Sequence, residues 1–264
     1  MSYAAETWNA LSAVRRASPL VHNITNYVSM DVTANALLAV GASPAMVHAE
    51  EEVEDFVSIA SALVVNIGTL SPAWVRGMER AAGRAGERGI PWVLDPVGAG
   101  ATPYRTGVAR DLARRGPTIV RGNASEILAL VEEGRAGKGV DSAHASDEAR
   151  HAAAHLAREL GCVVAVTGAL DYVTDGSRLL GVSNGHPMMA KVTALGCTAS
   201  ALAAAFAATT QDPLRATAYA LAVLGLCGEV AAREAEGPGS LRWRLLDALH
   251  GLDEATVLDG VRIS

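Results

Sequence analysis

Short apolar runs alternate with longer amphipathic or alanine-rich stretches along most of this chain. Runs that carry apolar residues on both faces occupy positions 62–66, 92–95, 118–121 and 162–167. Strands of this kind are typical of a parallel sheet that is covered on both sides by helices. The hydrophobic pattern therefore predicts an α/β fold with a mainly parallel central sheet flanked by helices on both faces.

The pattern changes after Thr167. Short strand-like pieces follow at 172–174, 179–182 and 188–192, with the turn signals Asp175-Gly176 and Asn184-Gly185 between them. These pieces predict hairpins that extend one side of the sheet. From Gly196 onward the chain is nearly all helical, with segments predicted at 196–209, 213–236 and 240–250. We expect residues 1–264 to form a single domain.

The segment 19–46 places uncharged hydrogen-bonding side chains ahead of an apolar helix predicted at roughly 26–40. His22, Asn23, Thr25 and Asn26 lie within five residues and carry no fixed charge at neutral pH. They could bind a small, neutral, polar molecule. An alternative interpretation is an N-cap cluster on an ordinary core helix, because Asn and Thr are favoured caps.

Three of the predicted strands end in a polar residue. Asn66, Asp95 and Thr167 stand at these ends, and open α/β sheets build their sites at the carboxyl ends of strands. Asp95 also begins a glycine-rich turn, so it is either a turn-former or a metal or water contact. Thr167-Gly168 could supply a hydroxyl and a close backbone approach to a nucleotide phosphate, or form a plain turn.

Residues 191–206 run from a strand through a glycine turn into a helix of small side chains. The first-turn amides of Gly196, Cys197, Thr198 and Ala199 could bind an anion such as a transferred phosphoryl group. The positive end of the helix dipole is expected to lower the pKa of Cys197, which could then accept a proton. The alternative is a small buried cysteine in a tightly packed helix.

Asn123 and Glu126 stand three residues apart where a strand leads into another helix. One interpretation is a capping box in which the Glu side chain reaches back to the cap. The other places Glu126 beside metal-bound phosphates, because Mg²⁺ is often held by one or two carboxylates and substrate phosphates. Arg121, at the strand end, could reach a phosphate with its planar guanidinium.

Composition narrows the class of protein. Half of the 264 residues are hydrophobic, the formal net charge is −6 and no Lys/Arg block occurs, which excludes a typical nucleic-acid surface. Three scattered cysteines fit neither a disulfide framework nor a zinc site. No signal-like segment or long uninterrupted apolar run is evident, so we expect a cytoplasmic protein without membrane contact. The polar, glycine-rich stretch 132–146 is expected to be a surface excursion.

Six motifs together carry a resemblance over essentially the whole chain. They are HNITNYVSMDVTANALLAVGASPAM, NIGTL at 66–70, WVLDPVGAG at 92–100, RGNASEILAL at 121–130, VTGALDYVTDG at 166–176 and the Gly196-Cys197 helix start. The chain resembles the hydroxyethylthiazole kinases, which belong to the ribokinase-like superfamily and serve thiamin salvage. The resemblance implies ATP-dependent phosphorylation of the primary hydroxyl of 4-methyl-5-(2-hydroxyethyl)thiazole, with Mg²⁺. Relatives form trimers with the thiazole site between subunits.

The resemblance also implies roles for individual residues. Met46, Asn26 and Ala194 would contact the thiazole, and Arg121 and Thr167 would bind ATP. Asp95 and Glu126 would act around the magnesium ion and the phosphates. Gly196, Cys197 and Thr198 would form the anion hole, and Cys197 would take the place of a catalytic Asp found in many ribokinase-like enzymes.

The chain departs from the family pattern at one place. The family usually has Gly-(Ala/Thr)-Gly-Cys after the Thr, whereas this chain has Thr193-Ala194-Leu195-Gly196-Cys197. The Cβ of Ala194 is expected to disfavour positive φ, and Leu195 is expected to narrow the anion hole. Two alternatives follow: a non-catalytic thiazole- or nucleotide-binding homologue, and a ribokinase-like kinase of another small alcohol.

Overall fold

An eight-stranded sheet forms the centre of the protein. The computed structural model describes residues 2–131 and 142–264, and its strands lie in the order β2-β1-β3-β4-β5-β6-β7-β8. All pairs from β2 to β6 are parallel, and β6-β7 and β7-β8 are antiparallel. The strands are β1 (Leu20–Ile24), β2 (Ser43–Ala45), β3 (Ala62–Asn66), β4 (Trp92–Asp95), β5 (Ile119–Asn123), β6 (Val163–Thr167), β7 (Asp171–Thr174) and β8 (Leu179–Val182).

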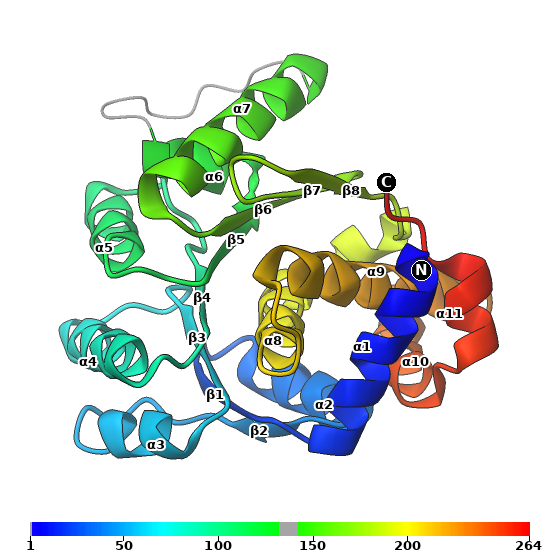
Figure 1. Ribbon diagram of the computed structural model, residues 1–264, viewed down its shortest axis with the longest axis horizontal. Helices are drawn as coiled ribbons and strands as arrows, with labels where there is room; N and C mark the ends of the chain where they lie inside the picture. Colours follow the sequence, from blue (N-terminus) through cyan, green and yellow to red (C-terminus); the bar gives the residue numbers. More distant parts are fainter. Residues whose placement is uncertain (1, 132–141) are drawn as a thin grey trace.

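Helices cover both faces of this sheet (Figure 1). One layer contains α3 (Val53–Ile59), α4 (Pro72–Arg88), α5 (Pro103–Ala113), α6 (Ala124–Val131) and α7 (Ser142–Leu160). The other contains α1 (Tyr3–Ala17), α2 (Met30–Val40), α8 (Leu195–Ala207), α9 (Pro213–Ala232), α10 (Pro238–Gly251) and α11 (Glu254–Gly260). The two layers and the sheet confirm the α/β prediction.

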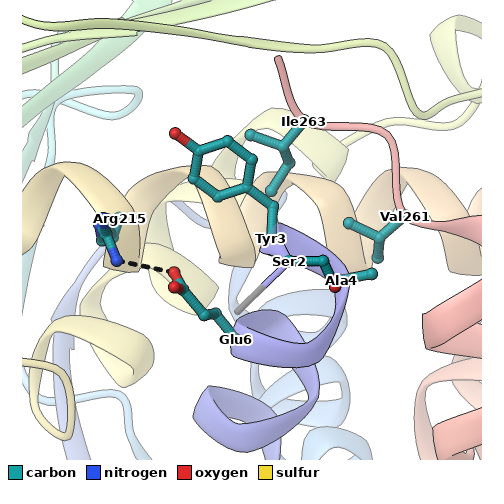
Figure 2. Close-up of a pocket in the computed structure, with 7 residues that line it drawn as sticks. All are labelled: Ser2, Tyr3, Ala4, Glu6, Arg215, Val261 and Ile263. Atoms are coloured by element: carbon teal, nitrogen blue, oxygen red, sulfur yellow. Dashed lines mark hydrogen bonds and ion pairs between the residues drawn. The ribbon is translucent and has the colours of Figure 1, made fainter.

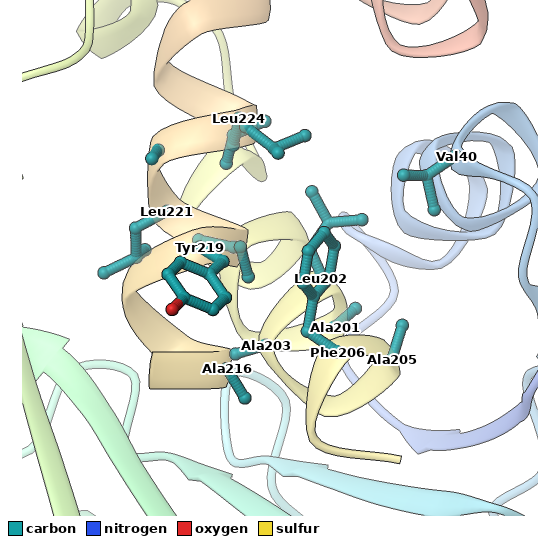
Figure 3. Packing of buried hydrophobic residues seen from close by; sticks show 14 of the residues in the cluster. Val40, Ala201, Leu202, Ala203, Ala205, Phe206, Ala216, Tyr219, Leu221 and Leu224 are labelled. Atoms are coloured by element: carbon teal, nitrogen blue, oxygen red, sulfur yellow. The ribbon is translucent and has the colours of Figure 1, made fainter. Parts of the chain in front are cut away.

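The larger core cluster centres on α8 and α9, whose side chains are mostly small and buried. Figure 3 shows Phe206 of α8 and Tyr219 of α9 among alanines and leucines of the two helices. Within the described residues, α9 is the one helix long and apolar enough by length and composition to cross a membrane, but most of it is buried inside the fold. The expectation that every apolar run is too short or too interrupted was therefore wrong for this helix, whose composition reflects a core position.

Two predicted elements differ from the structure. The helix predicted at 26–40 begins only at Met30, because the Oδ1 atom of Asn26 accepts the backbone N–H groups of Val28 and Ser29, both at 3.1 Å, and holds a turn there. The strand predicted at 188–192 is a 3₁₀ helix, η1 (Pro187–Lys191). The N–H of Met189 donates to the carbonyl of His186 at 2.9 Å, and the N–H of Val192 donates to the carbonyl of Met189 at 3.1 Å, so these donors are used locally and not in a strand ladder.

The hairpin prediction is confirmed by β7 and β8, with Gly176 in the left-handed region at φ 88° between them. Of the polar stretch 132–146, residues 132–141 lie outside the described residues, and 142–146 already belong to α7.

Candidate active site

A cavity of about 450 Å³ opens at the carboxyl ends of the central strands, beside the start of α8. It lies near the point where the strand order reverses between β1 and β3, which is where open α/β sheets bind ligands. Seven of the predicted site residues line it: Asn26, Asp95, Arg121, Glu126, Ala194, Gly196 and Cys197. With Gly68 and Thr69, which also line it, residues from five distant segments of the chain meet in one cavity.

Asn26 joins the turn before α2 to the centre of this cavity. Its Nδ2 donates to Oδ1 of Asn66 at 2.9 Å and also faces Sγ of Cys197 at 3.4 Å. Its Oδ1 caps the turn described above. The oxygen of Asn26 thus holds the turn before α2, whose N-cap is Ser29, and its nitrogen faces the site. Ligand binding by Asn26 stays a prediction.

Asp95 ends β4 and is completely buried. Its Oδ2 accepts from Nδ2 of Asn66 at 2.7 Å and from Oγ of Ser200 at 2.9 Å. Among the described residues, Oδ1 has no hydrogen-bond partner, and Nη1 of Arg121 lies 3.9 Å from it. The pKa of Asp95 is raised to about 6, mainly by burial; Arg121 and the two hydrogen bonds oppose this rise, and the Glu126 carboxylate adds to it.

Arg121 lies between Asp95 and Thr167. Its Nη2 donates to Oγ1 of Thr167, which stands opposite Asn123 in the β5-β6 register. A Cβ atom built on Gly196 would lie only 2.7 Å from Nη1 of Arg121. The glycine therefore lets the first turn of α8 approach the guanidinium closely. Thr167 does not line the cavity, and it reaches the site through Arg121.

Glu126 takes part in a capping box. Its Oε2 accepts the backbone N–H of Asn123 at 2.8 Å, and the Glu126 N–H donates to Oδ1 of Asn123 at 3.0 Å. Its Oε1 accepts the N–H of Gly98 at 2.9 Å, so the side chain also fixes the loop after β4. The capping interpretation is confirmed, and Glu126 lines the cavity as well.

Cys197 lies in the first turn of α8 and is half-buried, whereas Cys162 and Cys227 are buried. Burial raises the pKa of its thiol, and the Asp95 carboxylate raises it further, against hydrogen bonds from Asn26, Asn66 and Ser29 that favour the thiolate. The expectation that the helix start lowers this pKa was therefore wrong. Desolvation and a nearby carboxylate outweigh the dipole at this position.

The start of α8 also corrects the predicted anion hole. The N–H of Thr198 donates to the carbonyl of Ala194 at 2.9 Å, so it is already used within the helix. The amides that precede this first intrahelical bond belong to Leu195, Gly196 and Cys197. Ala194 adopts φ 66° despite its Cβ atom. The Leu195 side chain is buried in the core cluster and does not narrow the cavity.

Comparison with known proteins decides the family. A model of the hydroxyethylthiazole kinase family matches residues 11–255. The chain belongs to the hydroxyethylthiazole kinase family. The hydroxyethylthiazole kinase of Granulibacter bethesdensis is 56% identical over 252 residues, which cover 96% of this chain and 92% of that protein. The enzyme of Syntrophus aciditrophicus is 54% identical over 259 residues, covering 97% and 96%.

Solved structures agree with this assignment. The hydroxyethylthiazole kinase protein of Pyrococcus horikoshii OT3 superposes with a TM-score of 0.91 at 46% identity and covers 98% of each chain. A ribokinase-like superfamily protein of Enterococcus faecalis has a TM-score of 0.66 at 15% identity, over 90% of this chain and 88% of that one. The second likeness concerns the fold alone. The ribokinase-like fold prediction is confirmed.

Several residues of this hydroxyethylthiazole kinase family member lie away from the cavity. His22, Asn23 and Thr25 are buried and do not line it, so of the predicted polar cluster only Asn26 does. Met46 is half-buried just beyond the edge strand β2 and does not line the cavity either.

Two residues that organise the site, Asn66 and Ser200, were not predicted as site residues from the sequence. Asn66 was noticed as a strand end, but its pairing with Asp95 in the β3-β4 register was not foreseen. Ser200 stands four residues after Gly196, one helical turn further along α8, and this spacing could have identified it.

A second cavity, of about 470 Å³, lies near the two chain ends and is lined in part by Tyr3, Glu6, Arg215 and Ile263 (Figure 2). Its charged groups are paired with each other, since Nη1 of Arg215 donates to Glu6 at 2.7 Å and the Tyr219 hydroxyl also donates to Glu6. We therefore assign the chemistry to the cavity at the strand ends.

The donor set of that cavity fits a magnesium ion held mainly by its substrate. Within the described residues, no group of three or more His, Cys, Asp or Glu side chains could enclose a metal ion. Asp95 and Glu126 both line the cavity, and the buried Oδ1 atom of Asp95 lacks a partner. Mg²⁺ typically takes one or two carboxylates together with phosphate oxygens and water.

Proposed function

We propose that the protein transfers the γ-phosphoryl group of ATP to the primary hydroxyl of 4-methyl-5-(2-hydroxyethyl)thiazole. The hydroxyl oxygen forms a bond to phosphorus, the bond between the γ-phosphorus and the β-γ bridging oxygen breaks, and ADP leaves. The observation that carries this proposal is one cavity that combines the first turn of α8, including Cys197, with Asp95, Arg121 and Glu126. An anion-binding helix start beside carboxylates and an arginine suits phosphoryl transfer.

In this proposal Arg121 and Thr167 bind ATP, and the hydrogen bond between them aims the guanidinium at the phosphates. The open amides of Gly196 and Cys197 stabilise the charge on the transferred group. Asp95 and Glu126 would hold Mg²⁺, which when bound would screen the negative charge of the phosphates.

Asn26 and Ala194 contact the thiazole, and Cys197 lies beside its hydroxyl. In its thiolate form Cys197 accepts the hydroxyl proton. The raised thiol pKa makes the thiolate scarce at neutral pH, but a loose transition state needs little base catalysis because the hydroxyl becomes acidic only late in the reaction. We expect kcat to rise with pH as the thiol loses its proton.

We also propose a homotrimer whose thiazole sites lie between subunits. Val28 lines the cavity although its side chain is 62% exposed, and its neighbour Tyr27 is 68% exposed. Large apolar side chains at the rim of a site suit contact with a second subunit. Met46, which lies outside the cavity of one subunit, would then contact thiazole in the assembled site. The cytoplasm fits the three free cysteines.

The direct test is ADP release by purified protein with Mg-ATP, measured with and without the thiazole alcohol. We expect thiazole-dependent ADP and a phosphorylated thiazole. Thermal stabilisation by thiazole without turnover would instead support a binding homologue. Absence of both responses would favour another small alcohol as substrate.

Cys197→Ala tests the role of the thiol. We expect kcat to fall much more than thiazole affinity, because the group acts mainly in the transition state. An equal loss in kcat and in affinity would contradict this role. Cys197→Asp should keep measurable activity, since it restores a proton acceptor.

A further inference from the structure

The two oxygens of the Asp95 carboxylate have different surroundings. Oδ2 accepts two hydrogen bonds, from Asn66 at 2.7 Å and from Ser200 at 2.9 Å. Oδ1 lacks a hydrogen-bond partner among the described residues and lies on the side of Arg121, at 3.9 Å from Nη1. Both donors are uncharged, so they fix the carboxylate without neutralising it.

The orientation of the Asn66 amide follows from its neighbours. Its Oδ1 accepts from Nδ2 of Asn26 at 2.9 Å and from the N–H of Gly68 at 2.9 Å. With two donors facing the amide oxygen, the NH₂ group must point at Asp95. Asn66 is completely buried, so water does not compete for these bonds. A chain of hydrogen bonds therefore connects Cys197, Asn26, Asn66 and Asp95.

Ser200 supplies the second donor from the helix that carries Cys197. It is completely buried in α8. Its other nearby acceptor is the carbonyl of Gly196, at the longer distance of 3.5 Å. The same helix thus sets both the open amides at its start and the angle of the Asp95 carboxylate.

We propose that Asn66 and Ser200 are positioning residues, which hold Oδ2 of Asp95 and leave Oδ1 for the metal-bound nucleotide. The proposal rests on the kinase function proposed above. Without either donor the carboxylate can rotate about its Cβ–Cγ bond, and Oδ1 would lose its position beside Arg121. Pre-set orientation of a charged group is worth most in a buried site, where reorientation is costly.

Ser200→Ala removes one donor with little change in volume. We expect kcat to fall about tenfold or more, the range of a hydrogen bond to a charged group. Affinity for Mn²⁺, measured by electron paramagnetic resonance with a non-hydrolysable ATP analogue, should also fall about tenfold, and the KM for thiazole should stay unchanged. Thr217→Val is the matched control, because it removes another buried hydroxyl whose hydrogen bond stays within α9.

A double-mutant cycle separates positioning from general damage. If Ser200 acts through Asp95, Ser200→Ala should have no further effect on Mn²⁺ affinity in an Asp95→Ala background. Additive losses, or wild-type kcat and Mn²⁺ affinity in Ser200→Ala, would overturn the proposal. Asn66→Asp, which turns the donor to Asp95 into an acceptor, should also lower the affinity for Mn²⁺, as Ser200→Ala does.

Failure of the kinase proposal is recognised separately. It would appear as a wild-type protein without thiazole-dependent ADP. The Mn²⁺ affinities of Ser200→Ala and its control, which do not depend on turnover, would then still support or overturn the positioning role.

Discussion

Substitution of Gly196 by Ala tests whether the close approach of α8 to Arg121 is needed for nucleotide binding. The new Cβ would lie 2.7 Å from Nη1, 3.2 Å from Nη2 and 3.4 Å from Cζ of Arg121. Ordinary contact begins near 3.4 Å, so Nη1 must retreat by about 0.7 Å. The guanidinium then loses its place between Thr167 and Asp95.

The magnitude follows from the interaction that is lost. A hydrogen bond to a charged group contributes about 1.5–3 kcal/mol, so losing one such bond to a phosphate should raise the KM for ATP about 10- to 100-fold. Folding stability should change little, because Gly196 lies in a helix, where Ala is favoured by about 0.5–1 kcal/mol. This gain in helix stability offsets the free-energy cost of displacing the flexible end of the Arg121 side chain.

The assay compares the steady-state KM for ATP and thiazole with the unfolding free energy from urea titration. Gly83→Ala in α4 is the control, because its Cβ would meet no atom within 4 Å, so it should gain stability and keep both KM values. An unchanged KM for ATP in Gly196→Ala would refute the assignment of Arg121 to the nucleotide.

Two further predictions concern α8. Ala194→Gly should raise the unfolding free energy by up to about 1 kcal/mol in urea titration, because relief of a left-handed alanine, about 1–2 kcal/mol, exceeds the added entropy of the unfolded chain. The control is Ala208→Gly, at an ordinary helical φ of −64°, which should lower the unfolding free energy. Equal effects of the two substitutions would contradict the strain at Ala194. Alkylation of Cys197 by iodoacetamide should be slow at neutral pH and accelerate as pH rises, because burial and Asp95 raise the thiol pKa. Asp95→Asn lowers that pKa and should speed labelling at pH 8; no acceleration would rule out the carboxylate as a cause. Cys197→Ser is the labelling control.

The sheet and the location of the site were predictable because local patterns encode them. The apolar runs that end at Asn66 and Asp95 mark strands whose polar ends meet at one edge of the sheet. The Gly196-Cys197 pair likewise predicted the start of α8. These signals depend only on residues close together in the sequence, and they located the cavity correctly.

The electrostatics of the site were not predictable in the same way. The pKa of Cys197 depends on Asp95, which lies far away in the sequence, and on burial that no local pattern reveals. The N–H of Thr198 donates to the carbonyl of Ala194, because Ala194, in the left-handed conformation, is the residue at which α8 begins. His22 and Thr25 are buried because other parts of the chain cover their strand and turn. The polarity of these side chains alone does not indicate that burial.

The alanine-rich packing of α8 against α9 has a consequence for motion. Small buried side chains have few alternative rotamers, and neighbours in close contact leave little room for a helix to slide. We infer that α8 keeps its position when substrates enter. Backbone amides in the middle of α8 should accordingly exchange with deuterium only through global unfolding, even while the enzyme turns over.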